Sequence, residues 1–261
     1  MRPPLTPALA ELLAYLGEIG YGDVYVRAAA HEAASAAPPA GRRAPPVAPV
    51  SAGRAPELVS PAASFAPTPV KTPDSGRRAG ELAALAAMVA GCTRCRLAEG
   101  RTKVVFGSGN PDAELMLIGE GPGAEEDRQG LPFVGAAGEL LTKIIQAIDM
   151  QREDLYIANV VKCRPPGNRD PQPDEVTACR GFLEKQIALV QPRVIVALGK
   201  VAAQALLGND SSIGEMRGRW YRIHGVPAMV TYHPAALLRN QALKRPTWED
   251  MQQVRDRLRS G

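Results

Sequence analysis

The chain has 261 residues and a formal net charge of +4, and 45% of its residues are hydrophobic. So small a basic excess does not by itself indicate nucleic-acid binding, and any such surface must be a local patch. The sequence has no run of 18 apolar residues and no secretory signal pattern, so we expect no membrane segment and a cytoplasmic protein.

The first third of the chain differs from the rest. Residues 1–27 contain a predicted short helix that has five leucines on one face, namely Leu5, Leu9, Leu12, Leu13 and Leu16. Two interpretations stay open: the helix docks on its own domain, or it binds a protein partner. Residues 28–79 hold 16 Ala and 10 Pro, which predicts a disordered linker because so little apolar surface can be buried.

Residues 80–261 are expected to form one α/β domain. Short apolar runs predict buried strands at 114–120, 156–161, 194–199 and 226–232. Helical patterns are expected at 81–90, 138–148, 174–190, 200–207 and 246–260. Apolar strands that alternate with helices predict a three-layer α/β/α sandwich with a central, mainly parallel four-stranded sheet.

The four cysteines follow the spacing C-x2-C-x67-C-x15-C. They are Cys92, Cys95, Cys163 and Cys179, and together they can supply four thiolates to one site. Four thiolates suit either tetrahedral zinc or an iron–sulfur cluster, and the thiolate count does not choose between them. Disulfides are the alternative, but an intracellular chain of this length has little need of them.

Polar residues gather where the predicted parallel strands end, which is where such sheets bind ligands. A glycine turn at residues 119–123 follows the first strand, Asn159 lies in the second and His233 follows the fourth. Other interpretations stay open for each: a phosphate cradle for the turn, a structural hydrogen bond for Asn159 and a core position for His233.

Four motifs in this order carry a resemblance to a known family. They are Gly119-Glu-Gly-Pro-Gly123, Leu131-Pro-Phe-Val-Gly135, Asn159-Val-Val-Lys-Cys-Arg-Pro-Pro166 and His233-Pro-Ala-Ala-Leu-Leu-Arg239. Together with the cysteine spacing, they resemble family 4 of the uracil-DNA glycosylases, the iron–sulfur-containing bacterial and archaeal type. The resemblance implies the uracil-DNA glycosylase fold and a [4Fe–4S] cluster on the four cysteines. It also implies a monomeric, nucleoid-associated enzyme that removes uracil from DNA and so initiates base excision repair.

The resemblance also implies roles for residues at the strand ends. Gly121 and Gly123 would let the backbone approach the flipped uracil, Phe133 would stack on its ring, and the Asn159 amide would read its N3–O4 edge. An alternative on the same fold is a non-catalytic iron–sulfur module for DNA binding or electron transfer. A third is a nucleotide-binding protein that uses the glycine turn.

The chemistry and the DNA contacts are expected from neighbouring positions. His233 would donate a hydrogen bond to uracil O2, where negative charge grows as the glycosidic bond breaks. Glu120 is expected in the pocket wall, and Glu126 is expected to position the water. The DNA itself would be contacted by three residues of the last motif. Leu237 and Leu238 would form a wedge in the base stack, and Arg239 would contact a phosphate.

Overall fold

The computed structural model describes residues 75–260, and the helix predicted in residues 1–27 lies outside them. The first described helix, α2 (Ser75–Ala90), begins before the predicted domain boundary at residue 80. Arg78 of this helix is buried and donates hydrogen bonds to Asp112 and Gln191, at 2.8 Å each. The last residues of the segment expected to be a linker are therefore helical here and supply a buried arginine.

One sheet of six strands, in the order β1-β3-β2-β4-β6-β5, forms the centre of the domain. The strands are β1 (Ser108–Gly109), β2 (Leu115–Gly119), β3 (Tyr156–Asn159), β4 (Val194–Leu198), β5 (Trp220–Ile223) and β6 (Val226–Thr231). The four predicted strands are confirmed as β2, β3, β4 and β6, which run parallel. The sheet is wider than predicted because antiparallel β1 and β5 border it, and neither strand has a continuous apolar run.

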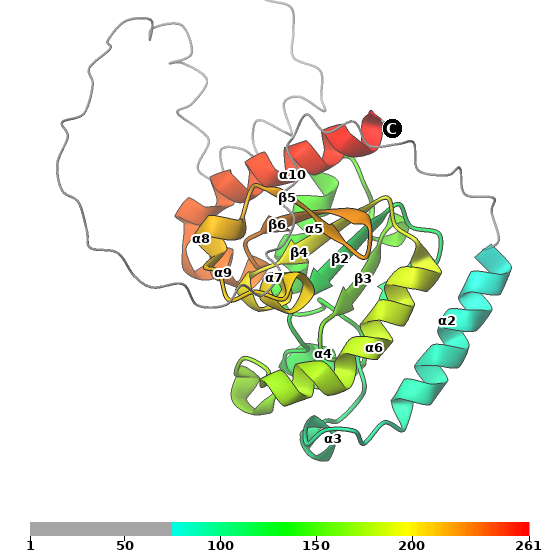
Figure 1. Ribbon diagram of the computed structural model, residues 1–261. Helices are drawn as coiled ribbons and strands as arrows, with labels where there is room; N and C mark the ends of the chain where they lie inside the picture. Colours follow the sequence, from blue (N-terminus) through cyan, green and yellow to red (C-terminus); the bar gives the residue numbers. More distant parts are fainter. Residues whose placement is uncertain (1–74, 261) are drawn as a thin grey trace, which may run out of the picture. The chain divides into compact units, whose positions relative to one another are not determined.

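Helices cover both faces of this sheet (Figure 1). After α2 come α3 (Leu97–Gly100), α4 (Ala124–Gln129), α5 (Ala136–Gln146), α6 (Pro173–Val190), α7 (Lys200–Leu207), α8 (Ile213–Met216), α9 (Pro234–Arg239) and α10 (Lys244–Arg259). The five predicted helices are confirmed as α2, α5, α6, α7 and α10. None of the helices within residues 75–260 is long and apolar enough to cross a bilayer.

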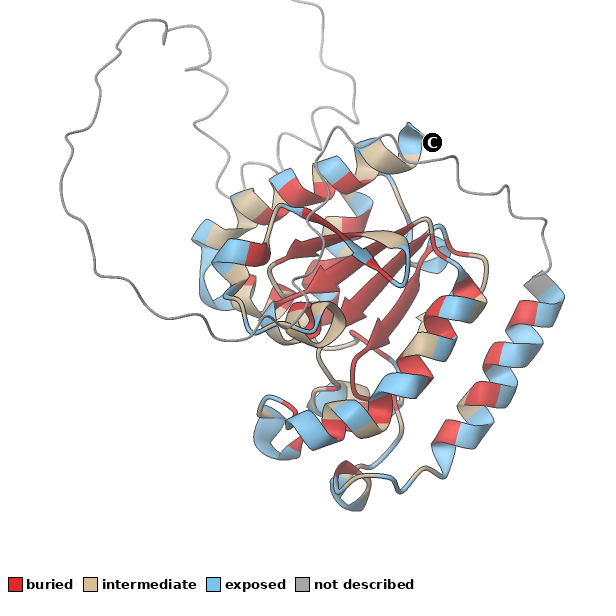
Figure 2. Cartoon of the chain, in the orientation of Figure 1, coloured by how far each residue is buried: buried red, intermediate tan, exposed pale blue. Residues whose placement is uncertain are grey.

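Alternation along the strands divides the core into two layers. In β2, Met116 and Ile118 join the core beneath α2 and α6, whereas Leu115 and Leu117 join the core beneath α5 and α10. Figure 2 shows the central strands as buried, which is why their sequences are apolar without interruption.

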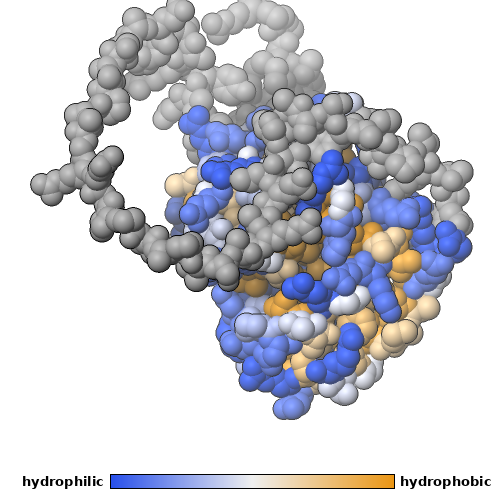
Figure 3. Space-filling view, viewed as in Figure 1, coloured by the Kyte–Doolittle hydropathy of each residue, from blue (hydrophilic) through white to orange (hydrophobic). Residues whose placement is uncertain are grey.

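An apolar groove with a volume of about 360 Å³ lies on the surface between α2 and α6. Leu85, Met88 and Leu189 line it, and Met88 is 63% exposed. Figure 3 shows hydrophobic side chains gathered over these helices among hydrophilic ones. The groove shares no residue with the cavity described below.

A buried carboxylate fixes α10 to the sheet. Asp250 of α10 is fully buried and accepts hydrogen bonds from Arg217 and from the Thr231 hydroxyl of β6, the latter at 2.7 Å. Removing one partner of a buried ion pair leaves the other charge uncompensated. We therefore expect Asp250→Ala to lower the free energy of unfolding by about 3 kcal/mol in urea denaturation. Glu249→Ala, which removes an exposed carboxylate on the same helix, is the control. Equal unfolding midpoints for the two variants would contradict the expectation.

Candidate active site

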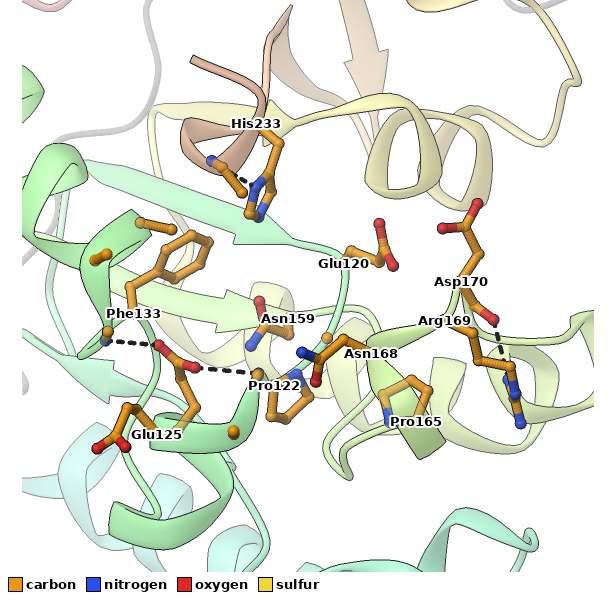
Figure 4. A pocket seen from close by; sticks show the side chains of 18 of the residues that line it. Glu120, Pro122, Glu125, Phe133, Asn159, Pro165, Asn168, Arg169, Asp170 and His233 are labelled. Carbon is orange, nitrogen blue, oxygen red and sulfur yellow. Dashed lines mark hydrogen bonds between the residues drawn. The ribbon is translucent and has the colours of Figure 1, made fainter. Parts of the chain in front are cut away.

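A cavity of about 480 Å³ opens at the carboxyl edge of the parallel strands. Loops that follow β2, β3 and β6 line it, because these strands end at the same edge of the sheet. It brings together most of the residues predicted for the site, namely Glu120, Gly121, Gly123, Glu126, Phe133, Asn159, His233 and Arg239. Figure 4 shows several of these side chains around the opening.

Asn159 is the last residue of β3 and lines this cavity. Its side chain is 2% exposed, and its Oδ1 atom is buried without a hydrogen-bond partner. Gly119 lies opposite in β2, where an added Cβ would come within 2.5 Å of that oxygen and 2.6 Å of the Phe133 ring. Since a buried polar atom without a partner costs free energy, the Asn159 Oδ1 atom is a candidate acceptor for a hydrogen bond from a ligand.

The Phe133 ring lies close to His233, with the ring centroids 5.5 Å apart and the planes tilted by 32°. Phe133 has a φ of 53°, which is rare for an aromatic residue and costs conformational energy. Gly138 makes this backbone path possible, because a Cβ there would lie 1.9 Å from the Phe133 carbonyl oxygen. The loop thus holds an aromatic face against the cavity in a strained conformation.

Glu126 joins the glycine turn to the Phe133 loop. Its carboxylate accepts hydrogen bonds from the backbone N–H groups of Gly123 at 3.1 Å, Val134 at 2.9 Å and Gly135 at 3.0 Å. Both carboxylate oxygens are therefore engaged by the backbone. The water-positioning role expected for Glu126 stays a prediction, and the structure adds a second role, which is to hold two cavity walls together.

Of the two predicted carboxylates, Glu120 has fewer hydrogen-bond partners than Glu126. No other described residue hydrogen-bonds its carboxylate. Burial, followed by the nearby negative charge of Asp170, raises the pKa of Glu120 to about 7. Figure 4 shows the Glu120 and Asp170 carboxyl groups on the same side of the cavity. Glu120 is therefore available to bind water or a developing positive charge at neutral pH.

His233 caps the N-terminus of α9, and its Nδ1 atom accepts a hydrogen bond from the Ala235 N–H at 3.2 Å. Burial, together with the positive charge of Arg239, lowers the pKa of His233 to about 4. The imidazole is therefore neutral at pH 7, and because Nδ1 is an acceptor, the proton resides on Nε2. This leaves Nε2–H as a donor.

The two leucines of α9 have different surroundings. Leu238 is 51% exposed, whereas Leu237 is 1% exposed and packs inside the domain. The prediction that both form a wedge is therefore wrong for Leu237, because consecutive helical residues point about 100° apart. Arg239, which follows them, is exposed and lines the cavity.

Comparisons with known proteins agree with this geometry. Residues 106–252 match the model of the uracil DNA glycosylase superfamily. A type-4 uracil-DNA glycosylase of Thermotoga maritima is 47% identical over 170 residues, which cover 63% of this chain and 88% of the relative. One from Sulfurisphaera tokodaii is 45% identical over 177 residues, or 64% of this chain and 80% of the relative. The chain belongs to the type-4 uracil-DNA glycosylase family. A type-5 uracil-DNA glycosylase of Thermus thermophilus is more distant, at 35% identity over 120 residues, with 40% of this chain and 54% of the relative covered.

The four predicted cysteines come from three segments of the chain. Cys92 and Cys95 lie between α2 and α3, Cys163 follows β3, and Cys179 lies in α6. All four are free thiols, so the disulfide alternative is wrong. Cys163 interacts electrostatically with Cys92 and Cys95, and Cys179 with Cys163 and Cys95. Burial raises the pKa of Cys163 and of Cys179, so thiolates here need a compensating positive charge.

Basic side chains surround these thiols. Arg101 donates a hydrogen bond to the Cys163 sulfur at 3.3 Å and another to the Cys92 carbonyl at 2.6 Å. Arg94, between Cys92 and Cys95, stacks 3.8 Å from the ring centroid of Phe182 in α6. The first cysteine pair is thus fastened to the rest of the domain.

One carboxylate connects the cysteine segment to the cavity wall. Glu175 of α6 is fully buried and accepts hydrogen bonds from Arg96 at 2.9 Å and from both Arg169 nitrogens at 2.7 and 2.8 Å. The bonds from Arg169, above all, lower the pKa of Glu175 to about 2. Because Arg96 follows Cys95 and Arg169 lines the cavity, Glu175 holds the two regions together.

The loop after β3 supplies cavity residues for which the sequence predicted no role in the pocket. Pro165, Asn168, Arg169 and Asp170 all line the cavity. Their position in the sequence could have identified them, since they follow the carboxyl end of a predicted parallel strand just as the glycine turn does.

Proposed function

We propose that the chain is a uracil-DNA glycosylase that takes deoxyuridine out of DNA into the cavity and hydrolyses its N-glycosidic bond. The observation that carries the proposal is the buried, unpaired amide oxygen of Asn159 beside Phe133. That oxygen can accept from uracil N3–H while the amide nitrogen donates to O4. Cytosine presents an acceptor at N3 and a donor at N4, so a fixed amide rejects it.

Phe133 and His233 complete the recognition of the base. The Phe133 ring stacks on uracil, and the Nε2–H of neutral His233 donates to O2. Bond cleavage leaves negative charge on the departing base. A donor already oriented toward O2 therefore stabilises the transition state more than the bound substrate. Since Phe133 and His233 lie in contact, both act on one ring.

Glu120 supplies the carboxylate for the sugar side of the reaction. As an anion it stabilises the cationic sugar from the pocket wall, while Glu126 positions the attacking water and also holds the cavity walls together. Only the ionised form of Glu120 serves this role.

A pKa of about 7 for Glu120 sets the expected pH dependence. The carboxyl is protonated below pH 7 and ionised above it, so the single-turnover excision rate should rise through pH 7 and then level off. Glu120→Gln should be slower at every pH and lack this rise, as measured with saturating enzyme between pH 5 and 9. If the rise persists in Glu120→Gln, another group titrates.

DNA is held outside the cavity by α9. Leu238 enters the base stack as a wedge in place of the extruded nucleotide, and Arg239 contacts a flanking phosphate. Further proposals are that the enzyme acts as a monomer in the cytoplasm, near the nucleoid, and that residues 1–27 contact a protein partner.

The four cysteines fit a [4Fe–4S] cluster. The thiols interact with one another, but among residues 75–260 no three His, Cys, Asp or Glu side chains are arranged to hold a metal ion. Four thiolates suit either a [4Fe–4S] cluster or a zinc ion, and the type-4 uracil-DNA glycosylase family, to which the chain belongs, favours the cluster. When bound, the cluster braces the segments that carry Cys92, Cys163 and Cys179.

Purified protein should therefore contain about four iron and four sulfide per chain. Cys163→Ser should lose iron and soluble yield together, because cluster binding is coupled to folding. Metal and sulfide analysis of anaerobically prepared protein checks this. Stoichiometric zinc without iron would overturn the cluster assignment.

The function is tested with duplexes that differ at one base. Enzyme is incubated with matched duplexes that carry U·G or C·G, and abasic sites are counted after alkaline strand cleavage. We expect cleavage only at uracil. A non-catalytic iron–sulfur DNA-binding module would bind both duplexes and cleave neither, so bound but uncleaved U·G duplex would refute the proposal.

A further inference from the structure

Lys162 lies directly behind the cavity and is fully buried. Its ammonium donates to the backbone carbonyl of Asn159 at 2.8 Å and to the Gln186 side chain at 2.5 Å. None of the steps proposed above uses it. A buried ammonium is costly unless it is fully paired, so its presence needs an explanation.

The sheet is incomplete beside Asn159. β1 pairs with β3 only at Ser108 and Gly109, and continuing that register would place Phe106 opposite Asn159. Instead, Gln186 of α6 donates to the Phe106 carbonyl at 2.9 Å, while Lys162 donates to the Asn159 carbonyl. Side chains therefore take the place of strand hydrogen bonds where the base-reading residue needs a fixed backbone.

The same lysine touches the cysteine site. Its ammonium and the Cys179 sulfur attract each other electrostatically, and Cys163 is the next residue in the chain. Thiolates that ligate a cluster supply the negative charge that a buried ammonium requires. Lys162 thus lies between the cysteine site and Asn159.

We propose that Lys162 is a positioning residue, which holds the Asn159 backbone in the base-reading geometry and is itself anchored by Gln186 and the thiolates of the cysteine site. The proposal rests on the proposed uracil-DNA glycosylase function. Without the ammonium, the Asn159 carbonyl loses its donor and the amide is free to rotate away from the N3–O4 edge. A misplacement of about 1 Å in a binding site reduces the reaction rate by ~100-fold.

The test compares Lys162→Met, which keeps the side-chain length, with Lys143→Met, which removes an exposed lysine from α5. We expect Lys162→Met to lower the single-turnover excision rate by ~100-fold while its affinity for an uncleavable duplex stays unchanged. A structural readout accompanies the rate: the ¹⁵N side-chain amide signal of Asn159, assigned from its loss in Asn159→Ala. Free uracil should shift this signal in the parent and in Lys143→Met but not in Lys162→Met.

The outcomes separate the two proposals. If the parent and Lys143→Met do not excise uracil, the proposed function fails. If they do and Lys162→Met matches them in rate and amide shift, the positioning role alone is wrong. Should Lys162→Met not fold, Gln186→Met removes the side-chain anchor but keeps the ammonium. We expect it to be ~10-fold slower, and a rate equal to the parent would overturn the proposal.

Discussion

Asn159→Ala should reduce the single-turnover rate of uracil excision by about a thousandfold while the protein keeps its fold and its affinity for DNA. The substitution removes the amide that pairs with both N3 and O4, and it leaves the Phe133 stack and the phosphate contacts in place. Rates are measured with enzyme in excess over a U·G duplex, and affinity is measured on an uncleavable analogue.

Two further variants sharpen this experiment. Asn209→Ala removes an asparagine whose side chain only accepts from the Ser211 N–H in a distant turn, and it should excise at the parent rate. Asn159→Asp should also be slow, but it should relax discrimination against cytosine, because a protonated carboxyl can donate to N3. Near-parent excision by Asn159→Ala would mean that Asn159 is a structural residue.

His233→Ala should slow the chemical step by about a hundredfold or more and change DNA affinity little. The reason is that the Nε2–H···O2 hydrogen bond strengthens as charge develops on the base. Single-turnover rates at saturating enzyme, set beside duplex affinities, separate the two quantities.

Arg239→Ala is the matched contrast on the same helix. The substitution should weaken DNA binding and make DNA affinity depend less steeply on salt concentration. The reason is that a phosphate contact contributes to binding, which precedes the chemical step. If His233→Ala instead lost affinity and kept its single-turnover rate, His233 would be a DNA-docking residue rather than the donor to O2.

The sequence predicted the central strands and the meeting of their ends for a physical reason. β2, β3 and β4 are buried on both faces, so their apolar runs are unmistakable, and parallel strands must end at one edge. Because these strands end at one edge, the sequence also predicted that the glycine turn, Asn159 and His233 lie close together. The outer strands β1 and β5 gave no comparable signal, because one has two residues and the other exposes Arg222.

Side-chain partners could not be predicted in the same way. Glu126 is expected to position the water, and the sequence did not reveal that its oxygens also accept from three backbone N–H groups that only the folded turn brings together. Leu237 and Leu238 are identical in sequence terms, and the packing of α9 alone decides which is exposed. Lys162 stands inside the motif at residues 159–166 without a role of its own, and its contact with the Asn159 carbonyl depends on where β1 ends.

The central claim is that the Asn159 amide reads the uracil edge beneath Phe133 and beside His233. A crystal structure of the protein with free uracil tests it most directly. We expect a uracil ring stacked on Phe133, with its N3 and O4 atoms hydrogen-bonded to Asn159 and its O2 atom hydrogen-bonded to His233 Nε2. Uracil bound elsewhere, or an Asn159 amide paired with protein while uracil occupies the cavity, would contradict it.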